Sequence, residues 1–239
     1  MRNLCIAHRG WSGKAPENTL AAFELALRQP GVDGIELDVH LSKDGVPVVI
    51  HDFHLSRTTN GAGKIADSTF SQLQQLDAGS WFAPSFSSQR IPSLEQVLQM
   101  YKGSKLINIE LKQIDNVYDG LEEQVVQFVH SYRMEEQVVI TSFDHYSVQK
   151  VKQLAPHLKA GPILCGNPLL LEEQLQEMNA DFLSIDCEFV TPRLVDKMRK
   201  SNTTIMGWTV NEPETMKELM NLSKEIWICT NHPDRLLAL

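Results

Sequence analysis

The stretch that decides the expected fold is Asp33-Gly-Ile-Glu-Leu-Asp-Val-His-Leu-Ser-Lys-Asp-Gly-Val-Pro-Val-Val-Ile-His-Asp52. In its first half, apolar residues alternate with Glu36 and Asp38, which is the period-two pattern of a β-strand. Side chains on a strand alternate between its two faces, so these two carboxylates share one face. A Lys-Asp-Gly turn and a second strand follow, and the second strand ends at His51. The stretch therefore predicts two carboxylates and a histidine close together.

Two like charges at this spacing repel each other unless a cation lies between them. A divalent metal is the simplest such cation, because hard cations bind several carboxylate oxygens. A solvated polar face is the other interpretation of a single Glu-x-Asp pair. The rest of the chain decides between them.

The chain has 239 residues, of which 42% are hydrophobic and 22% charged, as is usual for a globular protein with a sizeable core. This length suits one large domain such as a single α/β barrel. The formal net charge is −8. A nucleic-acid-binding protein usually carries a basic patch, so we expect no nucleic-acid partner.

The sequence also bears on the compartment. The first residues resemble a strand rather than a signal peptide, and no apolar run is long enough to span a bilayer. The cysteines lie far apart without a C-x-x-C motif, which favours free buried thiols in a reducing environment: Cys5, Cys165, Cys187 and Cys229. We therefore expect a cytoplasmic protein without a stable membrane anchor.

Strand and helix patterns alternate along most of the chain. Core strands are expected near residues 4, 35, 106, 138, 160, 182, 205 and 226, each followed by a helix. Repeated β-then-α units imply parallel strands with right-handed crossovers, and eight units fit a (β/α)8 TIM-type barrel. An open doubly wound sheet is the alternative, but no G-x-G-x-x-G or P-loop motif favours it. We expect one barrel domain over residues 1–239.

Residues 53–93 interrupt this alternation, and we expect an insertion of loops and short helices there. Its aromatic residues are expected to form its own small core: Trp81, Phe82 and Phe86. A helix with Glu17 or Asn18 as its cap is expected before the quoted stretch, and Ser93 should cap a helix that runs to about Tyr101.

In barrels of this type the chemistry lies at the carboxyl ends of the strands. The expected mouth gathers three carboxylates, two histidines, an arginine and a lysine: Glu36, Asp38, Glu110, His8, His51, Arg9 and Lys112. A solvated face does not predict charged residues gathered at one mouth. The sequence therefore predicts a functional site there.

These residues belong to motifs that resemble the glycerophosphodiester phosphodiesterase family, in the family's order and across nearly the whole chain. The motifs are Ala7-His-Arg-Gly10, Pro16-Glu-Asn-Thr19, Gly34-Ile-Glu-Leu-Asp-Val39, Ser42-Lys-Asp-Gly45, His51-Asp52, Arg57-Thr-Thr-Asn-Gly61, Ile109-Glu-Leu-Lys112, Ser142-Phe143 and Trp208-Thr-Val-Asn211. The resemblance implies a phosphodiesterase-type barrel with a small insertion after strand two. It also implies hydrolysis of glycerophosphodiesters to glycerol 3-phosphate and an alcohol, with a divalent cation.

The resemblance assigns roles by motif. Glu36, Asp38 and Glu110 resemble the metal ligands, and His8 and His51 resemble the acid–base pair. Two basic side chains are placed for the phosphate oxygens, and two aromatic ones are candidates to pack against the glycerol carbons: Arg9, Lys112, Trp208 and Phe143. Many relatives have an aspartate where this chain has Asn231, a position expected to serve loop structure. His40 is expected at the surface or a strand end.

The chemistry of these residue types agrees with that assignment. All-oxygen ligation suits Mg²⁺ or Ca²⁺, with Mn²⁺ also possible. We expect one histidine to take the proton from the glycerol 2-hydroxyl, which attacks phosphorus to give a cyclic phosphate, and the other to protonate the departing alcohol. By analogy His8 is the base and His51 the acid.

Other functions remain open at this stage. A lysophospholipase D-like or phospholipase C-like enzyme would need an apolar entrance or a membrane-binding surface. A non-catalytic glycerophosphodiester-binding protein would not need both histidines and all three carboxylates. A metal-dependent aldolase or sugar-phosphate isomerase would not explain His8-Arg9 beside the metal. Small, water-soluble diesters are the expected substrates, and the head group and oligomeric state are left open.

Overall fold

The computed structural model describes residues 2–239, in which eight parallel strands close into a barrel. The strands of the barrel are β1 (Cys5–Ala7), β2 (Gly34–Leu41), β4 (Leu106–Leu111), β5 (Val138–Ser142), β6 (Lys159–Leu164), β7 (Phe182–Asp186), β8 (Thr204–Trp208) and β9 (Trp227–Thr230). The barrel closes because β1 pairs with both β2 and β9. The predicted (β/α)8 barrel and its eight strand positions are confirmed.

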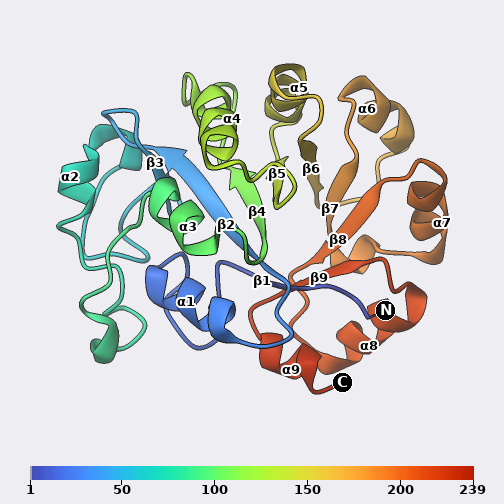
Figure 1. Cartoon of the computed structure of the whole chain (residues 1–239), viewed down its shortest axis with the longest axis horizontal. Coiled ribbons are helices and arrows are strands. Elements are labelled where there is room, and N and C mark those ends of the chain that lie inside the picture. The colour runs from blue at the N-terminus through green and yellow to red at the C-terminus, as the bar shows by residue number, and fades with distance from the viewer. Residues whose placement is uncertain (1) are drawn as a thin grey trace.

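A helix follows each repeat and lies on the outside of the barrel (Figure 1). These helices are α1 (Leu20–Arg28), α3 (Leu94–Tyr101), α4 (Leu121–Tyr132), α5 (His145–Leu154), α6 (Leu171–Glu177), α7 (Pro192–Lys200), α8 (Pro213–Leu222) and α9 (Pro233–Leu237), with a short 3-10 helix η3 (Cys187–Phe189) after β7. Their apolar faces pack on the outer faces of the strands and form the main core.

The interior of the barrel has two different layers. Buried apolar side chains from β1, β5, β7, β8 and β9 form one layer: Ile6, Val139, Phe182, Met206, Trp227 and Cys229. On β2 and β4 the inward positions are charged, with Glu36, Asp38 and Glu110. Different strands thus provide the apolar layer and the carboxylates at the mouth.

The short strand β1 explains how the chain reaches that mouth. It pairs with β2 only at Gly34 and Ile35, which leaves the end of β2 free on that edge. The extra strand β3 (Pro47–Val49) pairs antiparallel with this free end. The backbone N–H of Ile50 then donates to the carbonyl of Asp38 at 3.1 Å. This pairing carries the following His51 back over the carboxylates.

Residues 53–93 lie between β3 and α3 and hold η1 (Ile65–Asp67), α2 (Phe70–Leu73) and η2 (Pro84–Phe86), at the left of Figure 1. A separate apolar cluster packs this region under β3, and its members are mostly aliphatic: Val48, Ile50, Leu55, Ile65, Leu73, Ala78 and Ile91. The expected aromatic core is wrong. Trp81 is 42% exposed and Phe82 is 37% exposed, because the aliphatic side chains already fill the space and the aromatic rings pack edge to face on one another.

Two helix starts test the predicted caps. Ser93 caps α3 through a capping box with Gln96, as expected. The cap of α1 is Thr19, whose side chain accepts from the N–H of Ala22, rather than Glu17 or Asn18. Both of those side chains are engaged in the site described below, and so they are unavailable to the helix.

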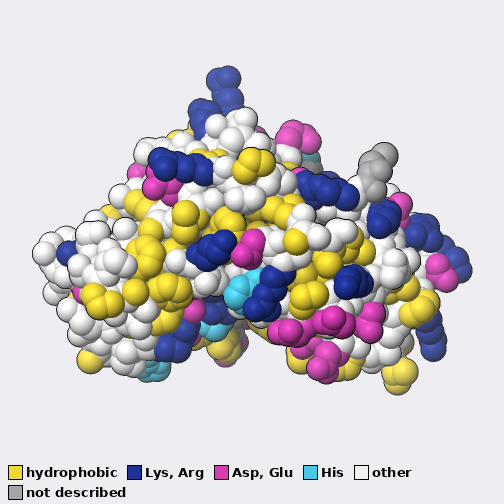
Figure 2. All heavy atoms as spheres, turned by 90° about the horizontal axis from the view of Figure 1, so that it is seen from below, with side chains coloured by type: hydrophobic (Ala, Val, Ile, Leu, Met, Phe, Trp, Pro, Cys, Tyr) yellow, Lys and Arg dark blue, Asp and Glu magenta, His cyan; other side chains and the backbone are white. Residues whose placement is uncertain are grey.

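The surface agrees with an acidic protein without a basic patch on the face in view. In Figure 2, lysine and arginine side chains are scattered among hydrophobic and uncharged ones. Among residues 2–239, no helix combines the length and apolar character needed to cross a bilayer. All four cysteines are free thiols, but Cys165 is exposed rather than buried, because it lies just beyond the end of β6.

Candidate active site

Three carboxylates converge at the mouth of the barrel. The parallel pairing of β2 with β4 places Asp38 beside Glu110, and Glu36 lies one inward position earlier on β2. One oxygen of each carboxylate lies within 4.8 Å of the others. All three side chains are largely shielded from water. The face shared by Glu36 and Asp38 is therefore the inner face of the barrel.

The electrostatics of this cluster are unfavourable without a cation. Burial, together with Asp38 and Glu110, raises the pKa of Glu36 well above its usual range. Burial and Asp38 raise the pKa of Glu110 to about 7. Although burial acts in the opposite direction, Lys112 and Arg9 hold the pKa of Asp38 well below its usual range. The fold thus concentrates negative charge that the two nearby basic groups only partly offset.

The donor set fits a hard divalent cation. Asp38 Oδ1 is fully buried and accepts no hydrogen bond from the described residues, and its cationic neighbour Lys112 Nζ lies 3.4 Å away, where it also contacts Glu110. A buried oxygen of this kind is costly unless a cation or donor meets it. Three carboxylate oxygens facing one point are the ligands that Mg²⁺, Ca²⁺ and Mn²⁺ prefer. Glu36, Asp38 and Glu110 are therefore able to hold such a metal.

The neighbouring loop fixes these ligands in place. Asn18 Nδ2 donates to Asp38 Oδ2 at 2.8 Å, and the N–H of Arg9 donates to Glu36 Oε2 at 3.0 Å. Arg9 and Gly10 adopt positive φ angles of 55° and 76°. A Cβ at Gly10 would meet the backbone of Ala22 at 2.7 Å, which explains the glycine in the Ala-His-Arg-Gly motif.

His8 directly follows β1 and lies beside Glu36. Its Nδ1 lies 2.7 Å from the side-chain oxygen of Asn231, so Nδ1 carries the proton and Nε2 is free. Nε2 lies 3.7 Å from Glu36 Oε2. Burial and the neighbouring Arg9 lower the pKa of His8 to about 4, which makes the ring neutral near pH 7. Asn231 thus orients His8, which corrects the expectation that it serves loop structure alone.

His51 is held differently. Its Nδ1 lies 2.6 Å from Asp52 Oδ1, which fixes the proton on Nδ1 and gives the ring an anionic partner. Burial lowers the pKa of His51, while Asp38 and Asp52 act in the opposite direction. Arg57 in turn binds both oxygens of Asp52, at 2.7 and 3.0 Å. His51 is therefore the histidine whose charged form has a counter-charge.

The two predicted phosphate-binding cations are engaged with carboxylates. Arg9 donates to Glu17 at 2.8 Å and lies 3.4 Å from Asp38. Lys112 Nζ contacts Glu110 at 2.6 Å and lies 3.4 Å from Asp38. Although burial lowers it, the pKa of Lys112 is raised by Asp38 and Glu110, which keeps the side chain charged. Both cations lie within the cluster, and their role toward phosphate stays a prediction.

His40 shares a face of β2 with Asp38 and is a supporting residue, although the sequence favoured a surface or strand-end position. It is fully buried, not at the surface as expected. Its Nε2 donates to the carbonyl of His51 at 3.0 Å, and its Nδ1 accepts from the hydroxyl of Tyr118 at 2.8 Å. Both ring nitrogens are satisfied in the neutral form. His40 therefore fixes the backbone of His51 from below.

A cavity of about 160 Å³ opens onto this cluster at the carboxyl ends of the strands. Seven of the nine predicted site residues line it: His8, Arg9, Glu36, His51, Glu110, Phe143 and Trp208. The rings of Phe143 and Trp208 pack edge to face with centroids 5.8 Å apart and form an aromatic wall. Of the other two predicted residues, Asp38 lies beneath and Lys112 lines a neighbouring groove.

Residues outside the predicted set complete the site. The sequence placed them in its motifs without assigning them a role in the site: Glu17, Asn18, Asp52 and Arg57. In the structure Arg57 bridges Glu17 and Asp52, so one ion-pair network connects the support of Arg9 to the support of His51. The signal that could have identified them is that they are polar residues within the same sequence motifs as the site.

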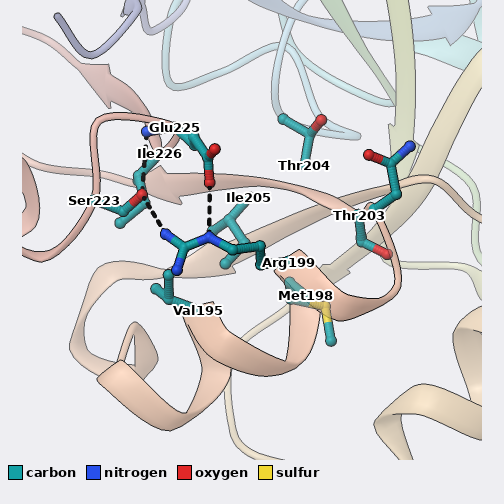
Figure 3. A pocket seen from close by; sticks show the side chains of 10 residues that line it. Val195, Met198, Arg199, Thr203, Thr204, Ile205, Ser223, Glu225 and Ile226 are labelled. Atoms are coloured by element: carbon teal, nitrogen blue, oxygen red, sulfur yellow. Dashed lines mark hydrogen bonds and ion pairs between the residues drawn. The ribbon is translucent and has the colours of Figure 1, made fainter.

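A second pocket, of about 200 Å³, lies at the opposite end of the barrel (Figure 3). It is lined by residues at the amino end of β8 and before β9, where Arg199 Nε donates to Glu225 at 3.2 Å. The guanidinium is therefore already paired with a carboxylate. The candidate active site is therefore the mouth formed by the carboxyl ends, where barrels of this type place their chemistry.

Comparison with known proteins identifies the family. Residues 8–235 match the glycerophosphoryl diester phosphodiesterase family. A glycerophosphodiester phosphodiesterase of Caldanaerobacter subterraneus subsp. tengcongensis is 41% identical over 100% of this chain and 98% of its own length. A phosphodiesterase of Oleispira antarctica, solved in complex with the product sn-glycerol-3-phosphate, is similar in structure with a TM-score of 0.91 and 30% identity over 99% of this chain and 96% of that one. A glycerophosphodiester phosphodiesterase structure from Agrobacterium tumefaciens gives a TM-score of 0.85 and 31% identity over 99% of this chain and 100% of its own.

Proposed function

The chain belongs to the glycerophosphoryl diester phosphodiesterase family, and from this premise we propose that it hydrolyses glycerophosphodiesters to sn-glycerol 3-phosphate and an alcohol with the help of a divalent cation. One observation carries the proposal: three buried carboxylates converge at the mouth of the barrel, and two histidines line the same cavity. The similar Oleispira protein, solved with sn-glycerol-3-phosphate, supports the product class.

Glu36, Asp38 and Glu110 would hold the cation, because their three buried carboxylates converge within 4.8 Å of one another. When bound there, a divalent cation supplies charge neutralisation for the phosphodiester and polarises the attacking hydroxyl. Arg9 and Lys112 add positive charge at the same place, and we propose that they bind phosphate oxygens once the carboxylates are otherwise neutralised.

The environments of the two histidines support different roles. His8 is neutral, with a free Nε2 that faces the cavity, and so it suits the general base. We propose that Nε2 accepts the proton of the glycerol 2-hydroxyl as its oxygen attacks phosphorus. His51 has the carboxylate of Asp52 as a partner, which stabilises an imidazolium. We propose that it donates a proton to the departing alcohol oxygen as the bond from phosphorus to that oxygen breaks.

The first step gives a cyclic phosphate and the free alcohol, and the second opens the ring with water. In the second step His51 takes the proton of water and His8 returns its proton to the glycerol oxygen, which restores both rings. The aromatic wall of Phe143 and Trp208 is our proposal for the surface that packs against the glycerol carbons.

The proposal is tested by release of glycerol 3-phosphate from glycerophosphocholine by metal-stripped protein. Mg²⁺, Ca²⁺ and Mn²⁺ are added back one at a time, with a chelator control. We expect metal-dependent release that is lost in Glu110→Ala, and a loss of at least about 10²-fold in kcat in His8→Ala and His51→Ala. The exposed His157→Ala is the matched control and should keep full turnover. Near-native turnover in either active-site histidine variant would contradict the two-histidine scheme.

A further inference from the structure

A groove adjoins the catalytic cavity on the side of His51. It has a volume of about 630 Å³, and His51 lines both spaces. Its walls come from two segments that the sequence separates widely: residues 53–66 after β3, and the loop between β4 and α4. Lys112, which contacts Glu110 in the cluster, also lines the groove. The groove is therefore continuous with the reacting centre.

The floor of the groove is aromatic and rigid. Phe53 and Tyr118 lie parallel with centroids 6.1 Å apart, and His40 packs edge-on against both rings. Because His40 also donates to the carbonyl of His51, the floor and the catalytic histidine are fixed together. Side chains locked in this way form a preorganised surface rather than a chance opening.

The outer wall exposes two aliphatic side chains on an ordered loop. Ile114 is 63% exposed and Val117 is 51% exposed. The intervening Asp115 and Asn116 adopt positive φ angles of 48° and 56° and close a tight turn, in which the N–H of Val117 donates to the carbonyl of Ile114. Gln113 anchors the base of this loop through two hydrogen bonds to the backbone of Tyr118. The fold thus holds apolar surface out into water at the edge of the groove.

The charges in the groove select against a cationic occupant. Its basic groups are Lys112, Lys64 and His54. Its one carboxylate is Asp52, whose oxygens are already bonded to His51 and Arg57. A quaternary ammonium or primary amine would therefore meet positive charge without a free anionic partner, whereas an uncharged aliphatic chain would be buried favourably.

We propose that this groove binds the leaving alcohol and that the preferred substrates are glycerophosphodiesters of apolar alcohols, such as an alkanol or a monoacylglycerol. The proposal rests on the proposed function, because it uses the assignment of His51 as the group that protonates the departing alcohol. The glycerol being attacked occupies the cavity beside His8, and the aliphatic part of the alcohol lies over Phe53 between Ile114 and Ala66.

The test compares hydrolysis of two soluble synthetic diesters, glycerophosphoethanol and glycerophosphohexanol. We expect the wild-type kcat/KM to be at least about tenfold higher for the hexyl ester, because added methylenes are buried in the groove. The gain should appear mainly in KM, since apolar binding of this kind is equal in the ground state and the transition state. Glycerophosphocholine should be a poorer substrate than the hexyl ester.

The double variant Ile114→Ser, Val117→Ser removes the apolar edge at exposed positions, so it is expected to fold. The ratio of its kcat/KM for glycerophosphohexanol to that for glycerophosphoethanol should fall to within about twofold of unity. The matched control is Leu169→Ser, which removes a side chain that is 96% exposed and outside the groove, and it should keep the wild-type ratio. The proposal would be overturned if the double variant kept the wild-type ratio, or if the wild type had equal kcat/KM for the two esters.

A third substrate tests which of the two groups on the phosphate occupies the groove, the leaving alcohol or the attacked glycerol. A diester with the hexyl chain on the attacked glycerol and ethanol as the leaving group should gain nothing over glycerophosphoethanol. A preference for that compound over glycerophosphohexanol would overturn the assignment of the groove to the leaving alcohol. Absence of any turnover of glycerophosphoethanol, with every metal, would instead contradict the proposed function itself.

Discussion

Two layers of the barrel interior are contributed by different strands and do opposite things. At the amino end of β7 and β9, Phe182 and Trp227 pack edge to face with centroids 5.1 Å apart, in an apolar layer. At the carboxyl end, Glu36 and Glu110 are buried with raised pKa values. The apolar layer stabilises the fold, while burial of the carboxylates costs stability. The proposed catalytic groups therefore lie at inward positions that do not contribute to the packed core.

The largest expected effect separates activity from stability at the carboxyl end. Glu36→Gln should lower kcat/KM by at least about 10³-fold, because a ligand of the proposed cation loses its charge. In chelator the same variant should melt at a higher temperature than the wild type, since a buried carboxyl whose ionised form is disfavoured in the fold is replaced by a neutral amide. Thermal melts with and without metal check this, and the exposed Glu24→Gln should change neither property. A lower melting temperature of Glu36→Gln than of the wild type in chelator would show that the buried carboxyl of Glu36 does not destabilise the metal-free fold.

The opposite pattern is expected at the amino end. Phe182→Ala should lower the free energy of unfolding by about 3–5 kcal/mol, because a fully buried ring leaves a cavity. The kcat of the folded variant should stay within about twofold of the wild type, since Phe182 is not among the residues that line the candidate active-site cavity. Urea unfolding and steady-state rates at low temperature measure the two quantities. A large loss of kcat with little loss of stability would show that the two layers are not separate.

The fold and the convergence of the three carboxylates were predictable from the sequence, because both follow from periodicity along single strands and from barrel architecture. Alternation on β2 places Glu36 and Asp38 on one face, and barrel architecture brings the strand ends together. Register across the barrel was not predictable in the same way. The contact between His8 and Asn231 joins residues 223 positions apart, and it depends on β1 closing the barrel against β9.

The burial of individual side chains was also not predictable from the sequence. His40 lies on a strand whose residues are all buried, because β3 and the loop that carries Tyr118 cover its outer end. Trp81 is exposed because aliphatic residues fill the small cluster beside it. In both cases the answer depends on segments distant in the chain, which single-strand patterns do not encode.

A smaller effect is expected from the partner of the proposed acid. Asp52→Asn should lower kcat for alkyl alcohols by about 10²-fold, because the imidazolium of His51 loses its counter-charge. The loss should be much smaller for glycerophospho-p-nitrophenol, whose leaving group departs without protonation. Steady-state rates for the two substrates measure this, and an equal loss with both would contradict the role of His51 as the acid.

The smallest effect concerns stability in acid. Hydrogen bonds from Arg57 lower the pKa of Asp52 to about 2 in the folded protein, against about 3.9 in an unfolded chain. A carboxyl with a depressed pKa stabilises the fold above its unfolded pKa, and the contribution is lost as the pH falls from about 4 to about 2. Since Arg57 is 43% exposed, we expect no more than about 1 kcal/mol. Denaturant unfolding should show the stability difference between wild type and Asp52→Asn shrinking over this range; a constant difference would contradict it.

The central claim is that Glu36, Asp38 and Glu110 form one binding site for a divalent cation. Titration of metal-stripped protein with Mn²⁺, followed by the loss of the signal of free Mn²⁺ in electron paramagnetic resonance, tests it most directly. We expect one ion bound per chain, competition by Mg²⁺ or Ca²⁺, and at least about tenfold weaker Mn²⁺ binding in Glu110→Gln. Equal Mn²⁺ affinity in the wild type and in Glu110→Gln would contradict it.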